Sequence, residues 1–225
     1  MTEVAPHPPL DCDTPRARGW TVILWLLTLA WLILLAVPIL ADGVQRVDDL
    51  AHDLVVAAEQ DVLVAAAHLL DVLGGTIASG VLVVIVAGVL AWQRRWPGLA
   101  VWLIVTALAE GLNALIKDVY ERARPPAGLV EEHTYSFMSG HSLTAAAMAI
   151  ALVLVFVPAG PQRRPWLALA VAYALLMAAS RVYLRAHWLT DTLAGATVGA
   201  TCAVSVALVA SWWHARAQEP TLSDA

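Results

Sequence analysis

The residues of this chain that could do chemistry fall into three short blocks between positions 117 and 191. The blocks bring together cations, hydroxyls and two histidines, and they are Lys117 with Arg124-Pro125, Ser139-Gly140-His141, and Ser180-Arg181 with His187 and Asp191. Cationic side chains neutralise phosphate oxygens, and a histidine can attack phosphorus or move a proton. Together these residue types indicate a site for phosphoryl chemistry.

The first block places two cations at the end of an apolar segment. Lys117 and Arg124 are seven residues apart, so a helix that continues past the membrane would carry both on one face. Pro125 and Pro126 should end that helix near Arg124, because a residue before proline is pushed out of helical geometry. The pair could bind phosphate oxygens, although a snorkelling basic pair at a membrane edge explains this block alone equally well.

The second block stands at the start of another apolar segment. Ser139 can cap the incoming helix, whose free N–H groups and positive dipole end attract negative charge. Gly140 has no Cβ, so the backbone there can approach a phosphoryl group closely, and His141 would stand beside it as a proton donor. Alone, this block is better interpreted as an ordinary helix start with a surface histidine.

The third block joins a histidine to a carboxylate at helical spacing. His187 and Asp191 are four residues apart, so on a helix the carboxylate could accept a hydrogen bond from one imidazole nitrogen. The other nitrogen would then be unprotonated and able to act as a nucleophile. Because His–Asp pairs are also common structural contacts, the prediction of catalysis rests on their conjunction with Ser180, Arg181 and His141.

Segments long enough to cross a membrane surround the three blocks. The chain has 225 residues, of which 60% are hydrophobic, whereas soluble domains are only about half apolar, so lipid is the expected solvent. A bilayer core about 30 Å thick requires about 20 mostly apolar residues per helix. Six segments qualify, and they are residues 20–41, 74–92, 98–117, 141–159, 165–183 and 189–213. We therefore predict an all-α polytopic membrane protein with six transmembrane helices.

Basic residues predict how these helices are oriented. Seven of the 13 Lys and Arg residues lie at one set of helix ends, which the positive-inside rule assigns to the cytoplasm: Arg16, Arg18, Arg94, Arg95, Arg163, Arg164 and Arg216. The others face outward, and all but the first lie in or beside the three blocks: Arg46, Lys117, Arg122, Arg124, Arg181 and Arg185. We expect a multi-pass plasma-membrane protein with both termini cytoplasmic and its site on the outer side.

The predicted domain organisation is a disordered cytoplasmic tail over residues 1–19, a six-helix domain over 20–213 and a cytoplasmic tail over 214–225. Residues 42–73 form the one long outer loop, which is acidic. Its apolar residues recur at helical spacing: Val47, Leu50, Leu54, Ala58, Val62, Ala66 and Leu69. We expect an amphipathic helix at the outer interface there, either as a lid over the site or packed on the surface.

Other charges near the blocks have more than one interpretation. Glu110 lies about 10 Å inward from Lys117 by helical rise, where an ionisable side chain is either functional or part of a buried hydrogen bond. The remaining outer charges are interpreted as solvated loop residues at the edge of the pocket: Glu121, Glu131, Glu132, His133 and Arg185. The basic residues form no run or stripe, which argues against a nucleic-acid partner.

The order and spacing of the three blocks resemble the signature of the type 2 phosphatidic acid phosphatase superfamily, which includes vanadium haloperoxidases and glucose-6-phosphatase. The resemblance rests on ten positions, Lys117-x6-Arg124-Pro125, Ser139-Gly140-His141 and Ser180-Arg181-x5-His187-x3-Asp191. The six predicted spans fit the membrane branch of that superfamily. One position departs, because the family usually has proline where this chain has Met138, and we expect a looser turn into the helix that follows.

The resemblance implies a role for each matched residue. His187 would be the nucleophile that forms a phosphohistidine, oriented by Asp191, and His141 would protonate the leaving oxygen and then activate water. The phosphoryl oxygens would be held by Lys117, Arg124, Ser139, the N–H of Gly140 and Arg181. Positioning and charge neutralisation dominate phosphoryl transfer, so three fixed cations should suffice and no metal or other cofactor is expected.

We therefore expect an integral membrane lipid phosphatase that hydrolyses a lipid phosphate or diphosphate at the outer leaflet. Small outer loops leave no room for a domain that binds a soluble substrate, so a lipid of the bilayer is the expected partner. Undecaprenyl diphosphate, phosphatidic acid and phosphatidylglycerol phosphate are candidates that the sequence does not rank. The alternatives are a phosphotransferase that passes the phosphoryl group from His187 to another acceptor, and a non-catalytic lipid-phosphate binder or transporter.

Overall fold

The computed structural model describes residues 15–36 and 38–217, and within them the chain forms eight helices and no strand. The helices are α1 (Pro15–Ala36), α2 (Pro38–Ala57), α3 (Asp61–Gly74), α4 (Thr76–Trp92), α5 (Trp96–Val119), α6 (Gly140–Phe156), α7 (Arg163–Tyr183) and α8 (Leu189–Ala217). The predicted all-α class is confirmed.

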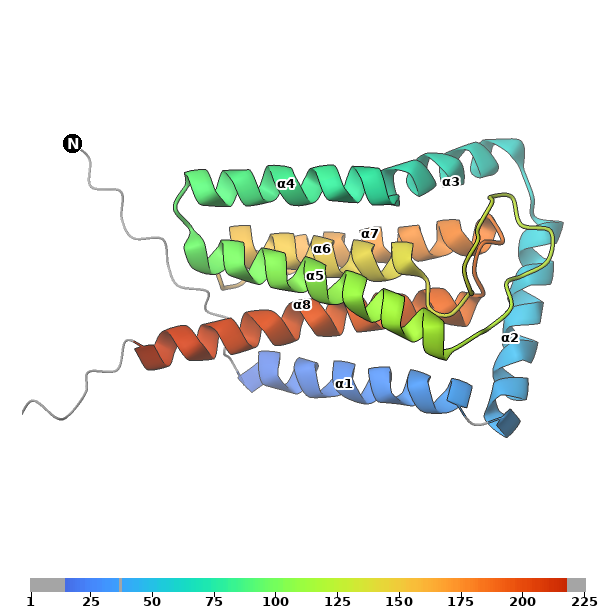
Figure 1. The fold of residues 1–225 in the computed structure, drawn as a ribbon, viewed down its shortest axis with the longest axis horizontal. Helices are drawn as coiled ribbons and strands as arrows, with labels where there is room; N and C mark the ends of the chain where they lie inside the picture. The colour runs from blue at the N-terminus through green and yellow to red at the C-terminus, as the bar shows by residue number, and fades with distance from the viewer. Residues whose placement is uncertain (1–14, 37, 218–225) are drawn as a thin grey trace, which may run out of the picture.

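Helices α1, α4, α5, α6, α7 and α8 run along the long axis of the molecule, α3 continues α4 at a bend, and α2 lies across one end (Figure 1). The loop between α5 and α6 and the short connection between α7 and α8 lie at that same end. Helix α1 begins, and α8 ends, at the opposite end of the bundle. The arrangement therefore gathers the ends of α5 and α7 and the starts of α6 and α8 beneath α2.

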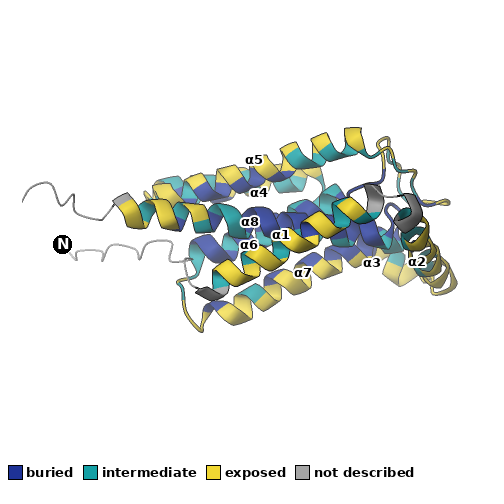
Figure 2. Cartoon of the chain, turned by 90° about the horizontal axis from the view of Figure 1, so that it is seen from below, coloured by how far each residue is buried: buried dark blue, intermediate teal, exposed yellow. Residues whose placement is uncertain are grey.

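Helix α6 forms the centre of the bundle, packed against α5, α7 and α8. Most of its residues are buried, whereas the outward faces of the surrounding helices carry exposed apolar side chains (Figure 2). An apolar surface of this extent is unfavourable in water and favourable in lipid. The burial pattern therefore describes a protein with a closely packed centre and an apolar periphery.

Two glycines of α8 set the distance between α8 and α6. A Cβ at Gly195 would lie 2.6 Å from the backbone oxygen of Ser139, and a Cβ at Gly199 would collide with the backbone oxygen of Leu143. Small residues four apart let two membrane helices bring their backbones together. The Gly195 contact falls at the first turn of α6, so it fixes where the Ser139-Gly140-His141 block lies against α8.

Four of the described helices are long and apolar enough to cross a membrane, and they are α1, α5, α7 and α8. A fifth span results if α3 and α4, which meet at a bend of 48°, are taken as one broken span. Helix α6 is apolar but has only 17 residues. The membrane-spanning character predicted from the sequence is thus present, with four to five spans identified by length and composition instead of six.

Several predicted boundaries differ from the structure. The predicted tail over residues 1–19 overlaps α1 from Pro15, and the predicted tail over 214–225 overlaps α8 to Ala217; residues 1–14 and 218–225 lie outside the described part. The acidic segment 42–73 contains most of two helices, α2 and α3, where one was expected. Helix α5 ends at Val119, so Arg124 lies in a loop and not on the predicted helical extension.

Helix α2 exposes its apolar side and buries a polar residue, which is the reverse of a helix packed on the surface of a soluble protein. Val47, Leu50 and Leu54 of the predicted apolar stripe are each more than half exposed, whereas Asp48 is 1% exposed. The apolar side of α2 therefore points away from the bundle and its carboxylate points inward. Such an orientation is typical of a helix that lies in a membrane interface.

Candidate active site

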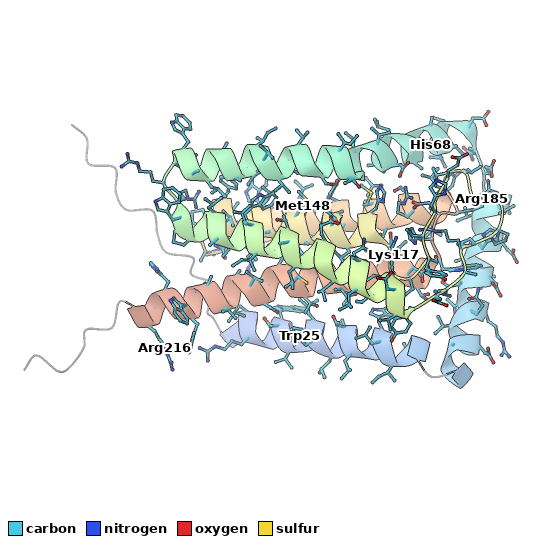
Figure 3. The ribbon with its side chains drawn as sticks, in the orientation of Figure 1. Trp25, His68, Lys117, Met148, Arg185 and Arg216 are labelled. Atoms are coloured by element: carbon cyan, nitrogen blue, oxygen red, sulfur yellow. The ribbon has the colours of Figure 1, made fainter. Side chains whose placement is uncertain are left out.

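The three blocks converge at the end of the bundle that α2 covers. Lys117 is in the last turn of α5, Arg181 is in the last turn of α7, and Asp191 is in the first turn of α8. Figure 3 places Lys117 and Arg185 at this end and Arg216 at the other. Residues from four different helices and two loops thus meet in one place, as the order of apolar segments predicted.

His187 lies in the connection between α7 and α8 and is almost wholly buried. Its Nδ1 is 2.7 Å from the backbone oxygen of Ser136, and its Nε2 is 3.3 Å from Nη1 of Arg124. A carbonyl only accepts hydrogen bonds and a guanidinium only donates them. Nδ1 therefore carries the hydrogen, and Nε2 presents a lone pair toward the cations.

The environment of His187 keeps its imidazole neutral. Burial, and then the positive charges of Arg124, Arg181 and Lys117, lower the pKa of His187 well below its usual value of 6.5. The bond to the Ser136 carbonyl opposes this shift but is the smallest of these effects. A neutral imidazole with an available Nε2 lone pair is the form that can attack phosphorus.

Asp191 is close to His187 but does not bond to it. Its Oδ2 lies 4.0 Å from Nδ1 of His187, whereas the hydroxyl of Ser136 donates to Oδ2 at 2.5 Å. The predicted direct hydrogen bond is therefore wrong, because His187 precedes α8 and the nearer Ser136 carbonyl takes its hydrogen. Asp191 holds Ser136 by the hydroxyl and Ser136 holds His187 by the carbonyl, so Asp191 acts on His187 through one intervening residue.

Arg124 contacts Nε2 of His187, and Lys117 lies beside Arg124. Arg124 donates to the backbone oxygens of Thr134 at 2.7 Å and Ala186 at 2.5 Å. Lys117 Nζ donates to the Thr134 hydroxyl at 2.9 Å, and Arg124 Nη2 donates to the same hydroxyl at 3.1 Å. The two cations of the first block therefore do point the same way, but the 120–139 loop aligns them and a continuous helix does not.

Glu132 was interpreted from the sequence as a solvated loop charge, and this interpretation is wrong. Its Oε1 accepts from Nη2 of Arg181 at 2.7 Å, and its Oε2 lies 3.3 Å from Nη2 of Arg124. Asp71 of α3 bonds to the other terminal nitrogen of Arg181, which is fully buried. Two carboxylates thus neutralise the arginines where, by the resemblance, phosphoryl oxygens would bind. Arg185, at the edge, pairs with Glu59 at 2.9 Å.

The second block begins α6 as predicted. Ser139 is its N-cap, with Oγ accepting from the N–H of Ser142 at 3.4 Å, and the Ser139 N–H donates to the backbone oxygen of Asp191 at 3.2 Å. A Cβ at Gly140 would lie 2.9 Å from Nδ2 of Asn113, so this position is tightly enclosed. Met138 is fully buried beside these bonds. The effect of Met138 on the turn into α6 stays a prediction.

A small polar cavity lies between the two histidines and extends toward the centre of the bundle. Its volume is about 160 Å³, and its lining includes Lys117, Glu132, Gly140, His141, His187 and Glu110. Glu110 accepts a hydrogen bond from the Thr144 hydroxyl at 3.2 Å. Ser180 does not face the cavity, because its hydroxyl donates to the backbone oxygen of Met177 at 2.7 Å.

Besides Asp71, three residues that support the site were given no role from the sequence. Arg122 donates to Oδ1 of Asp191 at 2.5 Å and to Oδ2 of Asp48 at 2.6 Å. Asp48 in turn accepts from the N–H of Thr190 at 2.9 Å. The third is Ser136, described above. The one sequence signal for Arg122 was its place among the basic residues that gather on the outer side. Ser136 and Asp48 belong to no recognisable sequence pattern.

Among the residues that the structure describes, no three His, Cys, Asp or Glu side chains are grouped so that they could hold a metal ion. The charged groups that face the cavity are instead the cations and carboxylates described above. A bundle of apolar helices with a neutral histidine and three cations at one end belongs to the class of helical membrane proteins that handle phosphate.

The chain belongs to the PAP2 superfamily, whose sequence profile matches residues 98–216. It is thus a membrane phosphatase of that superfamily, as the three blocks suggested. Phosphatidylglycerophosphatase B of Bacillus subtilis strain 168 is 31% identical over 176 residues, which cover 74% of this chain and 85% of the relative.

Two solved structures resemble the fold. The crystal structure of a transmembrane PAP2-type phosphatidylglycerolphosphate phosphatase from Bacillus subtilis superposes with a TM-score of 0.73 at 27% identity, covering 89% of this chain and 98% of that one. The crystal structure of LpxE from Aquifex aeolicus has a TM-score of 0.57 at 21% identity, covering 69% and 91%. The second likeness extends to the fold alone.

Proposed function

We propose that this protein hydrolyses the phosphomonoester of a glycerophospholipid through a phosphohistidine on His187. The observation that carries the proposal is the tautomer of His187, whose Nε2 lone pair faces Arg124 while Nδ1 is held by the Ser136 carbonyl. Phosphatidylglycerol phosphate is the proposed substrate, because the Bacillus subtilis sequence relative and the Bacillus subtilis crystal structure are both named as phosphatases that act on it.

The first step transfers the phosphoryl group to the enzyme. Nε2 of His187 attacks phosphorus, the bond from phosphorus to the lipid oxygen breaks, and His141 gives its proton to that oxygen. Arg124, Arg181 and Lys117 take the charge of the phosphoryl oxygens, so Glu132 and Asp71 must yield their places on the arginines. Once the carboxylates have moved aside, these cations stabilise the negative charge that develops on the phosphoryl oxygens in the transition state.

The second step returns the enzyme to its starting state. Water attacks the phosphohistidine, the bond from phosphorus to Nε2 breaks, and the proton of the water returns to His141. The products are a lipid alcohol and inorganic phosphate. The cavity between His141 and His187, about 160 Å³, provides the space in which the phosphoryl group and then the water would lie between the two imidazoles.

We further propose six spans, with α3–α4 and α6 crossing the bilayer beside α1, α5, α7 and α8. Three neighbouring helices, α5, α7 and α8, surround α6, so protein contacts can compensate for its short length. The exposed apolar side of α2 supports a position in the outer interface. The site beneath α2 would then lie at head-group depth on the outer side, with both termini in the cytoplasm.

Phosphate release by the purified protein tests the function. We expect free phosphate from phosphatidylglycerol phosphate, faster than from phosphatidic acid or undecaprenyl diphosphate, in EDTA and with no acceptor lipid added. Release that requires an acceptor lipid would instead indicate a phosphotransferase. Binding of these lipids without any release would indicate a binder or transporter, and would contradict the proposal.

The dependence of activity on pH tests the protonation state of His187. Because its pKa lies well below 6.5, protonation of the nucleophile should reduce kcat/KM only at pH values below 6.5. Phosphate groups of the substrate titrate near pH 6 as well, so the profile should be measured with a monoester and a diphosphate. A limb at or above pH 6.5 that both substrates share would contradict the assignment.

A further inference from the structure

Asp71, in the last turn of α3, contacts two residues assigned to the reaction. Its Oδ1 lies 3.2 Å from Nε2 of His141, and its backbone oxygen lies 3.2 Å from the same nitrogen. The same Oδ1 bonds to Nη1 of Arg181. Because an ionised carboxylate and a carbonyl both only accept hydrogen bonds, Nε2 of His141 must carry a hydrogen directed at Asp71.

The end of α3 also forms a wall against the His141 ring. A Cβ at Gly74 would lie 3.0 Å from Cδ2 of His141 and 2.6 Å from Cε of Met177. The absence of a side chain at Gly74 therefore lets the last turn of α3 close upon the imidazole. Asp71 precedes Gly74 by three residues, so one helical turn both packs against the ring and bonds to its edge.

Several charged groups lie near His141, but they differ in whether they contact its imidazole. Arg181 from α7 bonds to the carboxylate of Asp71, and Lys117 from α5 and Glu132 from the 120–139 loop line the same cavity as His141. Of these charged groups, Asp71 is the one that bonds to the imidazole. A carboxylate in contact with an imidazole stabilises the protonated ring and fixes its orientation.

We propose that Asp71 is the positioning residue of His141, forming a second histidine–carboxylate pair in the site. Asp71 holds Nε2–H, which leaves Nδ1–H to give its proton to the lipid oxygen as the bond from phosphorus breaks. Nδ1 regains a proton from the water that hydrolyses the phosphohistidine. This inference rests on the proposed function, and it assigns a catalytic purpose to the acidic segment that precedes α4.

A comparison of two leaving groups tests this role. An alkoxide from a lipid phosphate needs a proton as it leaves, whereas 4-nitrophenolate leaves without one, so only the first reaction depends on a general acid. For Asp71→Asn we expect kcat/KM to fall at least about tenfold for phosphatidylglycerol phosphate, since general acids contribute about 10²- to 10⁴-fold. For 4-nitrophenyl phosphate the loss should be less than about threefold on the same reasoning.

Two further variants serve as the positive and the negative control for this comparison. His141→Asn removes the acid itself and should produce the same selective loss with a larger amplitude. Asp61→Asn changes an exposed carboxylate at the other end of α3, and it should leave both substrates unaffected. The Asp71→Asn protein should elute from size exclusion like the unmodified protein.

The outcomes separate the inference from the proposed function. Equal losses on both substrates would show that Asp71 acts through Arg181 or through the fold, and would overturn the inference. No loss on either substrate would also overturn it. If the unmodified protein releases phosphate from neither substrate, the proposed function itself fails.

Discussion

Replacement of His187 by glutamine is expected to lower phosphate release by at least about 10⁴-fold, since removal of a covalent nucleophile costs enzymes about that much or more. The amide can still donate to the Ser136 carbonyl, which holds His187 at 2.7 Å, but it has no basic nitrogen to bond to phosphorus. A substrate labelled at phosphorus should leave acid-labile label on the unmodified protein after rapid quenching, and none on His187→Gln.

The matched control is His133→Gln, which changes an exposed histidine of the 120–139 loop. This variant should retain full turnover and the acid-labile label. Both proteins should remain monodisperse in detergent, so loss of activity in His187→Gln cannot be ascribed to unfolding. Undiminished phosphate release from His187→Gln would exclude the phosphohistidine mechanism.

Replacement of Gly199 by alanine is expected to separate α8 from α6. The new Cβ would collide with the backbone oxygen of Leu143, which, unlike the end of a flexible side chain, cannot move aside cheaply. Overpacking typically costs about 1–3 kcal/mol, and a backbone contact should lie at the upper end of that range. Differential scanning fluorimetry in detergent should therefore show a Tm several degrees lower.

Activity should fall in the same variant even at temperatures where the protein is folded. Displacement of α6 moves the Ser139-Gly140-His141 block relative to His187, and an error of about 1 Å in such a geometry can cost about a hundredfold in rate. The control is Gly88→Ala in α4, where a Cβ would meet nothing within 4 Å. Equal Tm values for Gly199→Ala and Gly88→Ala would contradict the close-packing argument.

The sequence predicted the site well where local chemistry determines it. The ten motif positions carry their own signals, such as the N-cap at Ser139, which the structure contains. Counting of apolar segments was sufficient to place Lys117, His141 and His187 around one cavity. Those inferences need only helical periodicity and the alternation of helix ends along a bundle.

The contacts that could not be predicted from the sequence are those that depend on backbone atoms or on helices distant in the chain. The partner of His187 Nδ1 is the carbonyl of Ser136, and every residue has a carbonyl, so no residue type marks it. Asp48 and Asp71 lie far from the motifs in the chain, among other acidic residues, and only the packing of α2 and α3 distinguishes them. Glu132 was misjudged because the sequence does not distinguish a solvated loop carboxylate from one that pairs with a buried arginine.

The ion pair between Asp48 and Arg122 connects the site to a helix outside the region that the superfamily profile matches. The region matched by the superfamily profile begins at residue 98, whereas Asp48 belongs to α2 and reaches Asp191 through Arg122. Residues 98–216 taken alone would carry the nucleophile but would leave Arg122 with one carboxylate partner instead of two. The smallest unit that can be exchanged with its chemistry intact therefore begins no later than α2.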